Sequence, residues 1–282
     1  MPTAEELKAL VAQIPDPDKN GTYANMDDQK IEQIEKVVAR LCEGGRDAVL
    51  GLIDMLVEPG KGDDIKPHFA LHLMAVRASA PGGEEARAEF ARAVASQVGG
   101  DRPKAVQEYL IQVLQLAGTR EAVEALGRAL LDPDLCDAAA RALAAIRDGA
   151  AEQLLAALPK VKGRGRLSII KKLAVLRSDK AADAFKQALG DADADIRIAA
   201  AWGIARIADA SAADVLLSSA EARHGWERIN QTDACMALAD ALAAAGKKDA
   251  AAALYARLQK TCTAASERHV REAAERRLSA AK

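Results

Sequence analysis

Side chains that carry oxygen ligands are grouped in one short segment near the start of the chain. The segment Asp16–Asp27 reads DPDKNGTYANMD, which puts acidic or amide oxygens at positions 1, 3, 5 and 12 and glycine at position 6. Calcium takes about six to eight oxygen ligands, and a glycine at that point allows the sharp turn of a calcium-binding loop. The predicted ligands are Asp16, Asp18, Asn20, Thr22 (through its backbone carbonyl) and Asp27.

This spacing is the EF-hand pattern, with two departures. Position 12 is Asp27, which is shorter than the usual glutamate, and Tyr23 stands where an aliphatic residue is usual. The alternative is a solvated turn rich in Asp, Pro, Asn and Gly, in which Asp27 caps the following helix. No cofactor is expected unless this loop binds calcium, and both interpretations of the loop stay open.

A second group with metal-binding chemistry is a histidine pair. His68 and His72 are four residues apart in a predicted helix, and Asp64 lies one turn earlier, so the three side chains would share a face. Two imidazoles and a carboxylate can bind zinc or another transition metal. No glutamate base accompanies the pair as in HExxH, and Pro67 leaves the placement of Asp64 open. Ordinary surface histidines are the alternative that the sequence favours.

Basic residues are concentrated between positions 160 and 180, where eight lysines and arginines stand against the single acid Asp179. Such a cluster can bind phosphates or an acidic protein, but no aromatic residue is interleaved for stacking on bases. An acidic protein is therefore favoured over nucleic acid, and a solvated helix face is the alternative. The predicted partner-binding residues are Lys162, Arg164, Arg166, Lys171, Lys172 and Trp226.

The two tryptophans are notable because aromatic residues make up only 3% of the chain. Tryptophan is a typical anchor of protein interfaces. Trp226 follows Arg223-His224-Gly225 in a long connection and is expected to be available to a partner. Trp202 lies beside the apolar stripe of a predicted helix and is expected to belong to the core.

The sequence contains no catalytic motif. It has no GxSxG, no phosphate-binding glycine loop and no cysteine with a matching histidine partner. The four cysteines lie far apart without ligand spacing and are expected to be buried apolar residues: Cys42, Cys136, Cys235 and Cys262. This pattern favours a non-catalytic protein.

The elements that must position these residues are helices. Half of the residues are apolar and many are alanine, the best helix former. The clearest segment is Asp191–Leu217, where Asp193 can cap a helix whose buried face carries Ile196, Ala200 and Ile204. A second amphipathic face follows a short turn, so the segment predicts a helical hairpin.

This hairpin recurs along the chain with a regular period of about 30 residues, which is typical of helical repeat proteins. Asp132–Asp148 matches Asp193–Asp209, which lies two such units later. In the second helices, Ala181–Phe185 lies one unit before Ala212–Leu216. One hairpin cannot bury its own apolar face, so such units must stack.

The motif in the clearest copy resembles the short HEAT-like repeat of armadillo-type α-solenoids, of the kind also found in phycobilisome lyase subunits. It reads Asp193-x-Asp195-Ile196-Arg197-x-Ala199-Ala200-x-x-Gly203-Ile204-x-x-Ile207-x-Asp209. Over the rest of residues 27–260, apart from Asp132–Asp148, only hydrophobic spacing carries the resemblance. The resemblance implies that Arg197 pairs with an aspartate in or beside its own repeat, whereas Cys136 at the matching position interrupts such a charged ladder. Tetratricopeptide repeats are the structural alternative, but their bulky aromatic positions are missing.

We therefore expect an all-α, right-handed α-α superhelix of the armadillo/HEAT-like kind, with about seven helical hairpins. Residues 1–26 would form an N-terminal helix and polar loop, and residues 27–282 the repeat solenoid with a C-terminal capping helix. The expected hairpins are 27–43 with 46–58, 65–79 with 84–98, 102–117 with 120–131, 135–147 with 150–158, 166–177 with 180–189, the pair within 191–217, and 226–245 with 249–260, before the last helix 266–280.

The expected function is non-catalytic protein binding on a concave face lined by the second helices. Two other classes stay open: a bilin-lyase-type subunit that attaches a chromophore, which the resemblance implies, and a HEAT-like nucleic-acid-binding protein. The formal net charge of −2 gives no general attraction to nucleic acid or to an acidic membrane. With no membrane-spanning window and no signal-peptide core, the sequence predicts a cytoplasmic protein, and an exported protein without its signal would look the same. The oligomeric state is left open.

Overall fold

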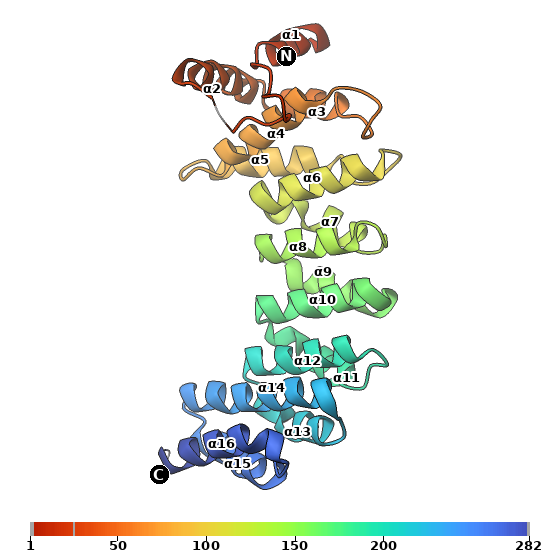
Figure 1. Cartoon of the computed structure of the whole chain (residues 1–282). Helices are drawn as coiled ribbons and strands as arrows, with labels where there is room; N and C mark the ends of the chain where they lie inside the picture. Colours follow the sequence, from red (N-terminus) through yellow and green to blue (C-terminus); the bar gives the residue numbers. More distant parts are fainter. Residues whose placement is uncertain (1–2, 25, 281–282) are drawn as a thin grey trace. The chain divides into compact units, whose positions relative to one another are not determined.

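The structure is a computed structural model that describes residues 3–24 and 26–280. Every regular element of these residues is a helix, and the chain divides into two compact units, Met1–Gln153 and Leu154–Lys282. Figure 1 shows the helices in chain order. The predicted all-α class is confirmed.

The first unit consists of antiparallel helix pairs preceded by one short helix. The described helices are α1 (Ala4–Ala12), α2 (Asp28–Glu43), α3 (Gly45–Asp54), α4 (Ile65–Ala78), α5 (Glu84–Ala95), α6 (Lys104–Ala117), α7 (Val123–Ala129) and α8 (Cys136–Ile146). The boundary between the units falls within α9 (Ala150–Ala157). The N-terminal helix expected within residues 1–26 is α1, which buries Leu7, Leu10 and Val11 and packs on α2, α3 and α4.

The second unit continues the pattern of helical hairpins. Its helices are α10 (Gly163–Leu176), α11 (Ala182–Ala188), α12 (Ala194–Ile207), α13 (Ala213–Glu221), α14 (Gly225–Ala244), α15 (Lys248–Thr261) and α16 (Arg268–Ala280). The first helices α10, α12 and α14 pack on one another, and α11, α13 and α15 pack against them. The seven predicted hairpins and the last helix are thus present in the described part of the chain, as a helical solenoid requires.

Three of the second helices begin with a short 3-10 turn that the sequence did not predict. These turns are Arg120–Ala122, Asp179–Ala181 and Ala210–Ala212, directly before α7, α11 and α13. In the last of them Asp209 accepts a hydrogen bond from the backbone N–H of Ser211 at 2.9 Å. A 3-10 turn tightens the helix start, so the chain can reverse over only a few residues.

The core follows the predicted apolar stripe. Ile196, Ala200 and Ile204 are at most 1% exposed. Among the cysteines, Cys136, Cys235 and Cys262 are buried as predicted and Cys42 is half-buried, and all four are free thiols. Burial raises the pKa of Cys136 to about 11, which keeps it as an uncharged apolar group near neutral pH.

Gly203 sets the closest approach between α12 and α11. A Cβ added there would lie 2.5 Å from the ring of Phe185, which is fully buried. We expect Gly203→Ala to lower the free energy of unfolding by about 1 kcal/mol, because overpacking outweighs the gain in helix propensity. Urea unfolding followed by tryptophan fluorescence would measure this, since both tryptophans lie in the second unit. A variant more stable than the wild type would contradict this prediction, because it would show that the Phe185 ring can move to make room for the added methyl group.

Candidate functional site

The first helices of the second unit share one register. α10, α12 and α14 begin at Gly163, Ala194 and Gly225, at equal intervals of one repeat, and Figure 1 shows these helices side by side. Packed helices lie about 8–10 Å apart, so residues at equal positions form rows across the three helices. The fourth residue of each helix is an arginine, namely Arg166, Arg197 and Arg228.

Arg197 joins its own repeat to the next one. Its guanidinium makes two hydrogen bonds of 2.6 Å to the carboxylate of Glu227 in α14. It also donates to the backbone carbonyls of Asp191 and Ala192, just before α12, at 2.7 and 2.9 Å. Gln231, which is fully buried, donates to Glu227 at 2.9 Å. The expected aspartate partner in or beside its own repeat was wrong, because Glu227 of the next first helix takes this role.

Arg166 and Arg228 repeat this arrangement on the neighbouring helices. Arg166 lies 2.8 Å from Asp191, and Arg228 forms an ion pair with Glu267. Each also donates to a carbonyl near the end of the preceding second helix or its final turn. We call these three arginines and their acids the arginine ladder. It spans three consecutive repeats, and the first of them follows the repeat in which Cys136 takes the arginine position.

The carboxylates of the arginine ladder titrate below their ordinary range. Hydrogen bonds from Arg197 hold the pKa of Glu227 below its ordinary value of 4.5, and those from Arg228 do the same for Glu267. A lowered pKa in the folded state means that the ionised pair stabilises the fold fully above that ordinary value. This contribution is lost as the pH falls through the folded-state pKa.

A pH series tests this linkage. We expect Glu227→Gln to be less stable than the wild type near neutral pH, and the gap in free energy of unfolding to close as the pH falls from about 5 to about 3. Urea unfolding at each pH measures the gap. An equal gap at neutral and acidic pH would contradict the charge-based role of Glu227.

A groove of about 630 Å³ crosses α10, α12 and α14 on the surface of the second unit. Its lining includes Val175 and Ile198 beside both tryptophans, of which Trp226 is 71% exposed and Trp202 40% exposed. Ten large apolar side chains are exposed in the described part of the chain. Four of them lie on these three helices: Val175, Trp202, Trp226 and Ile229. Exposed apolar residues that cluster in this way mark interaction sites.

Charged side chains from all three helices line this groove. Lys171 and Lys172 line it from α10, while Asp195 and Asp233 line it from α12 and α14. Within the described residues, none of these four side-chain charges has an ion-pair partner. The groove therefore offers two amines and two carboxylates to a ligand.

Trp202 is held in place by a neighbour on its own helix. The guanidinium of Arg206 lies 5.1 Å from the ring centroid, a cation–π contact. The expectation that Trp202 belongs to the core was wrong, because its ring covers Arg206 at the surface instead of entering the interior. The repeat period could have predicted this exposure, since Trp202 stands at the same helix position as the charged residues Lys171 and Asp233.

The structure gathers three of the six predicted partner-binding residues. Lys171, Lys172 and Trp226 line the groove. Lys162 and Arg164 are exposed at the start of α10, outside the lining. Arg166 is not available to a partner, because it belongs to the arginine ladder and its side chain is only 21% exposed.

In the oxygen-rich segment, the predicted calcium ligands have partners within the protein. Asp18 accepts hydrogen bonds from the backbone N–H groups of Asn20 and Thr22, both at 2.9 Å, and from the Thr22 hydroxyl at 2.8 Å. Asp27 caps α2 by accepting from the N–H of Lys30 at 2.9 Å. These contacts are those of the turn and helix cap that formed the alternative interpretation.

Two other predicted ligands also have partners: Asp16 forms an ion pair of 2.8 Å with Lys66 of α4, and the Thr22 carbonyl accepts from the Asp18 N–H at 2.8 Å. Residue 25 of this segment lies outside the described residues. Across residues 3–24 and 26–280, no three His, Cys, Asp or Glu side chains are placed as a metal site would need. Calcium binding stays a prediction.

Of the two predicted histidine ligands, only His68 forms a hydrogen bond with Asp64 among the described residues. His68 lies 3.0 Å from Asp64, and its ring packs edge-on against Tyr109, whose hydroxyl donates to the His68 carbonyl at 2.6 Å. His72 is exposed on the same helix. His68 therefore fits the ordinary structural histidine that the sequence favoured.

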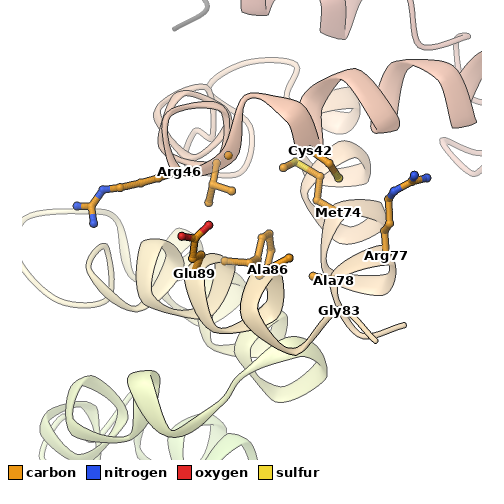
Figure 2. A pocket seen from close by; sticks show the side chains of 11 residues that line it. Cys42, Arg46, Met74, Arg77, Ala78, Gly83, Ala86 and Glu89 are labelled. Carbon is orange, nitrogen blue, oxygen red and sulfur yellow. The ribbon is translucent and has the colours of Figure 1, made fainter. Parts of the chain in front are cut away.

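A smaller hollow of about 220 Å³ in the first unit is lined by residues of α2, α3, α4 and α5. Figure 2 shows Cys42 and Met74 facing it, while the guanidinium groups of Arg46 and Arg77 extend away on opposite sides. Neither guanidinium group therefore places its positive charge inside the hollow.

Comparisons with known proteins name no relative. No model of a known protein family matches the chain, and no curated protein matches it. The crystal structure of an engineered protein from the Northeast Structural Genomics Consortium aligns with 99% of this chain and 84% of that chain, at 18% identity and a TM-score of 0.41. A second engineered protein from the same consortium aligns with 98% and 96%, at 18% identity and a TM-score of 0.24. None of the helices described is long and apolar enough to cross a membrane.

Proposed function

We propose that this chain is a non-catalytic, HEAT-like repeat protein that binds a protein partner through the groove on α10, α12 and α14. The observation that carries the proposal is the pair of exposed tryptophans beside two lysines and two aspartates whose charges have no ion-pair partner among the described residues. Tryptophan buries a large apolar area on binding, and flanking charges select the orientation of the partner.

The groove supports a protein partner more than a nucleic acid. Asp195 and Asp233 share the lining with Lys171 and Lys172, so a phosphate backbone would meet two carboxylates as it crossed the helices. Arg166, counted in the basic cluster, is committed to the arginine ladder. Neither bilin attachment nor nucleic-acid binding has an observation of its own in its favour.

The proposed surface differs from the one expected from the repeat pattern. The concave face was expected on the second helices, whereas the groove is lined by residues of the first helices α10, α12 and α14. The residues that line the groove stand at positions 2, 5, 6, 9, 10 and 13 of these first helices, so several of them occupy equivalent positions in neighbouring repeats. A partner would thus contact consecutive repeats at equivalent positions.

Affinity capture tests the proposal. Immobilised wild-type protein is compared with Lys171→Glu/Lys172→Glu and with the control Lys247→Glu/Lys248→Glu, which makes the same charge change at exposed lysines before and in α15. We expect a lysate of the source organism to yield a partner that the control retains and the groove variant loses. Equal recovery by both variants would contradict the proposal.

A further inference from the structure

We infer that the groove takes an extended segment of the partner protein, with an acidic, a large apolar and a basic residue at intervals of about three residues. This inference rests on the proposed function and names the chemistry of the segment that occupies the site. It follows from the order of side chains along the rows that cross the three helices.

The ninth residues of α10, α12 and α14 form one such row. They are Lys171, Trp202 and Asp233, so a positive charge, an aromatic ring and a negative charge follow one another across the groove. Lys172 adds a second amine at the positive end. A segment that crosses the row meets complementary groups when it presents a carboxylate, an apolar side chain and a cation in that order.

A second row lies seven residues earlier in each helix, and its aromatic residue is on α14 instead of α12. The second residues of the helices are Arg164, Asp195 and Trp226. The two rings therefore lie on neighbouring helices, two helical turns apart along their axes. Both rings line the same groove, so they give it an apolar surface for a large apolar side chain.

The distance between helices sets the spacing of the segment. Packed helices lie about 8–10 Å apart, and an extended chain rises about 3.3 Å per residue, so one step between helices corresponds to about three residues. A helical segment would need about seven residues for the same step, because its rise is only about 1.5 Å per residue.

The probe is a blocked heptapeptide, Glu-Ser-Gly-Phe-Ser-Gly-Lys, which places the three groups at intervals of three. Matched peptides carry Glu at both ends, Lys at both ends, or Ser in place of Phe. Binding to the full chain is followed by the fluorescence of Trp202 and Trp226, which are its only tryptophans. We expect the Glu/Lys peptide to bind the wild type best, and the loss of Phe to weaken it by about tenfold.

Charge reversal in the protein should then reorder the peptides. Asp233→Lys should favour the Glu/Glu peptide, and Lys171→Glu/Lys172→Glu the Lys/Lys peptide, each by about fivefold over the wild type. Circular dichroism checks that both variants fold, and each variant must gain affinity for one peptide, which a damaged protein would not do. An unchanged order of affinities overturns the inference.

Three further outcomes would also overturn it. Tighter binding of a helical peptide with the same groups seven residues apart would replace the extended segment. A wild-type dimer in sedimentation that Asp233→Lys dissociates would assign the row to a second copy of the chain. If no peptide binds while the groove variant still loses its captured partner, the segment is wrong and the proposed function stands.

Discussion

Replacing Arg197 with alanine is expected to lower the free energy of unfolding of the second unit by about 3 kcal/mol. The side chains of Arg197 and Glu227 are only 11% and 14% exposed, and two hydrogen bonds of 2.6 Å join them. The variant leaves Glu227 poorly solvated and two backbone carbonyls without their donor. Gln231 still donates to Glu227, which keeps the loss at the lower end for a broken buried pair.

Urea unfolding monitored by tryptophan fluorescence measures this loss in the second unit. Arg197→Lys keeps the charge but not the two parallel hydrogen bonds, so an intermediate loss is expected. The control is Arg268→Ala, which breaks an exposed ion pair with Glu272 in the same unit and should leave the free energy of unfolding almost unchanged. If Arg197→Ala and Arg268→Ala are equally stable, the arginine ladder does not hold the repeats together.

Replacing Trp226 with alanine is expected to weaken binding of the captured partner by about 30-fold, which corresponds to about 2 kcal/mol. The indole is 71% exposed in the free protein, so its truncation should change the free energy of unfolding by less than about 0.5 kcal/mol. Loss of affinity without loss of stability is the signature of an interface anchor.

The control for this prediction is Leu131→Ala. Leu131 is 50% exposed and lies outside the groove, in the first unit. Titration calorimetry with the purified partner should give equal affinities for this variant and the wild type. A Trp226→Ala protein that binds as tightly as Leu131→Ala would remove Trp226 from the interface.

Helix pairs could be predicted from the sequence because local spacing determines them. The stripe through Ile196, Ala200 and Ile204 has helical periodicity, and these residues are buried. Arginine partners could not be predicted in the same way. Glu227 stands one repeat after Arg197 in the chain, so their contact depends on how consecutive first helices pack.

The candidate site was half predictable for the same reason. Lys171 and Lys172 stood out by charge and Trp226 by its rarity, but sequence alone did not show that three helices bring them to one groove. Trp202 was misplaced because a residue at the edge of an apolar stripe can turn inward or outward. Its contact with Arg206, one turn later, fixes the outward position.

The most direct test of the proposed binding surface is site-specific photo-crosslinking. A benzophenone side chain replaces Val175 in the groove, and in a second protein it replaces Val215 on the second helix α13. The two valines are 38% and 42% exposed, so the probes are equally accessible. Binding through the first helices predicts an adduct with the captured partner from position 175 and none from position 215. An adduct from position 215 alone would contradict it and return the interface to the second helices.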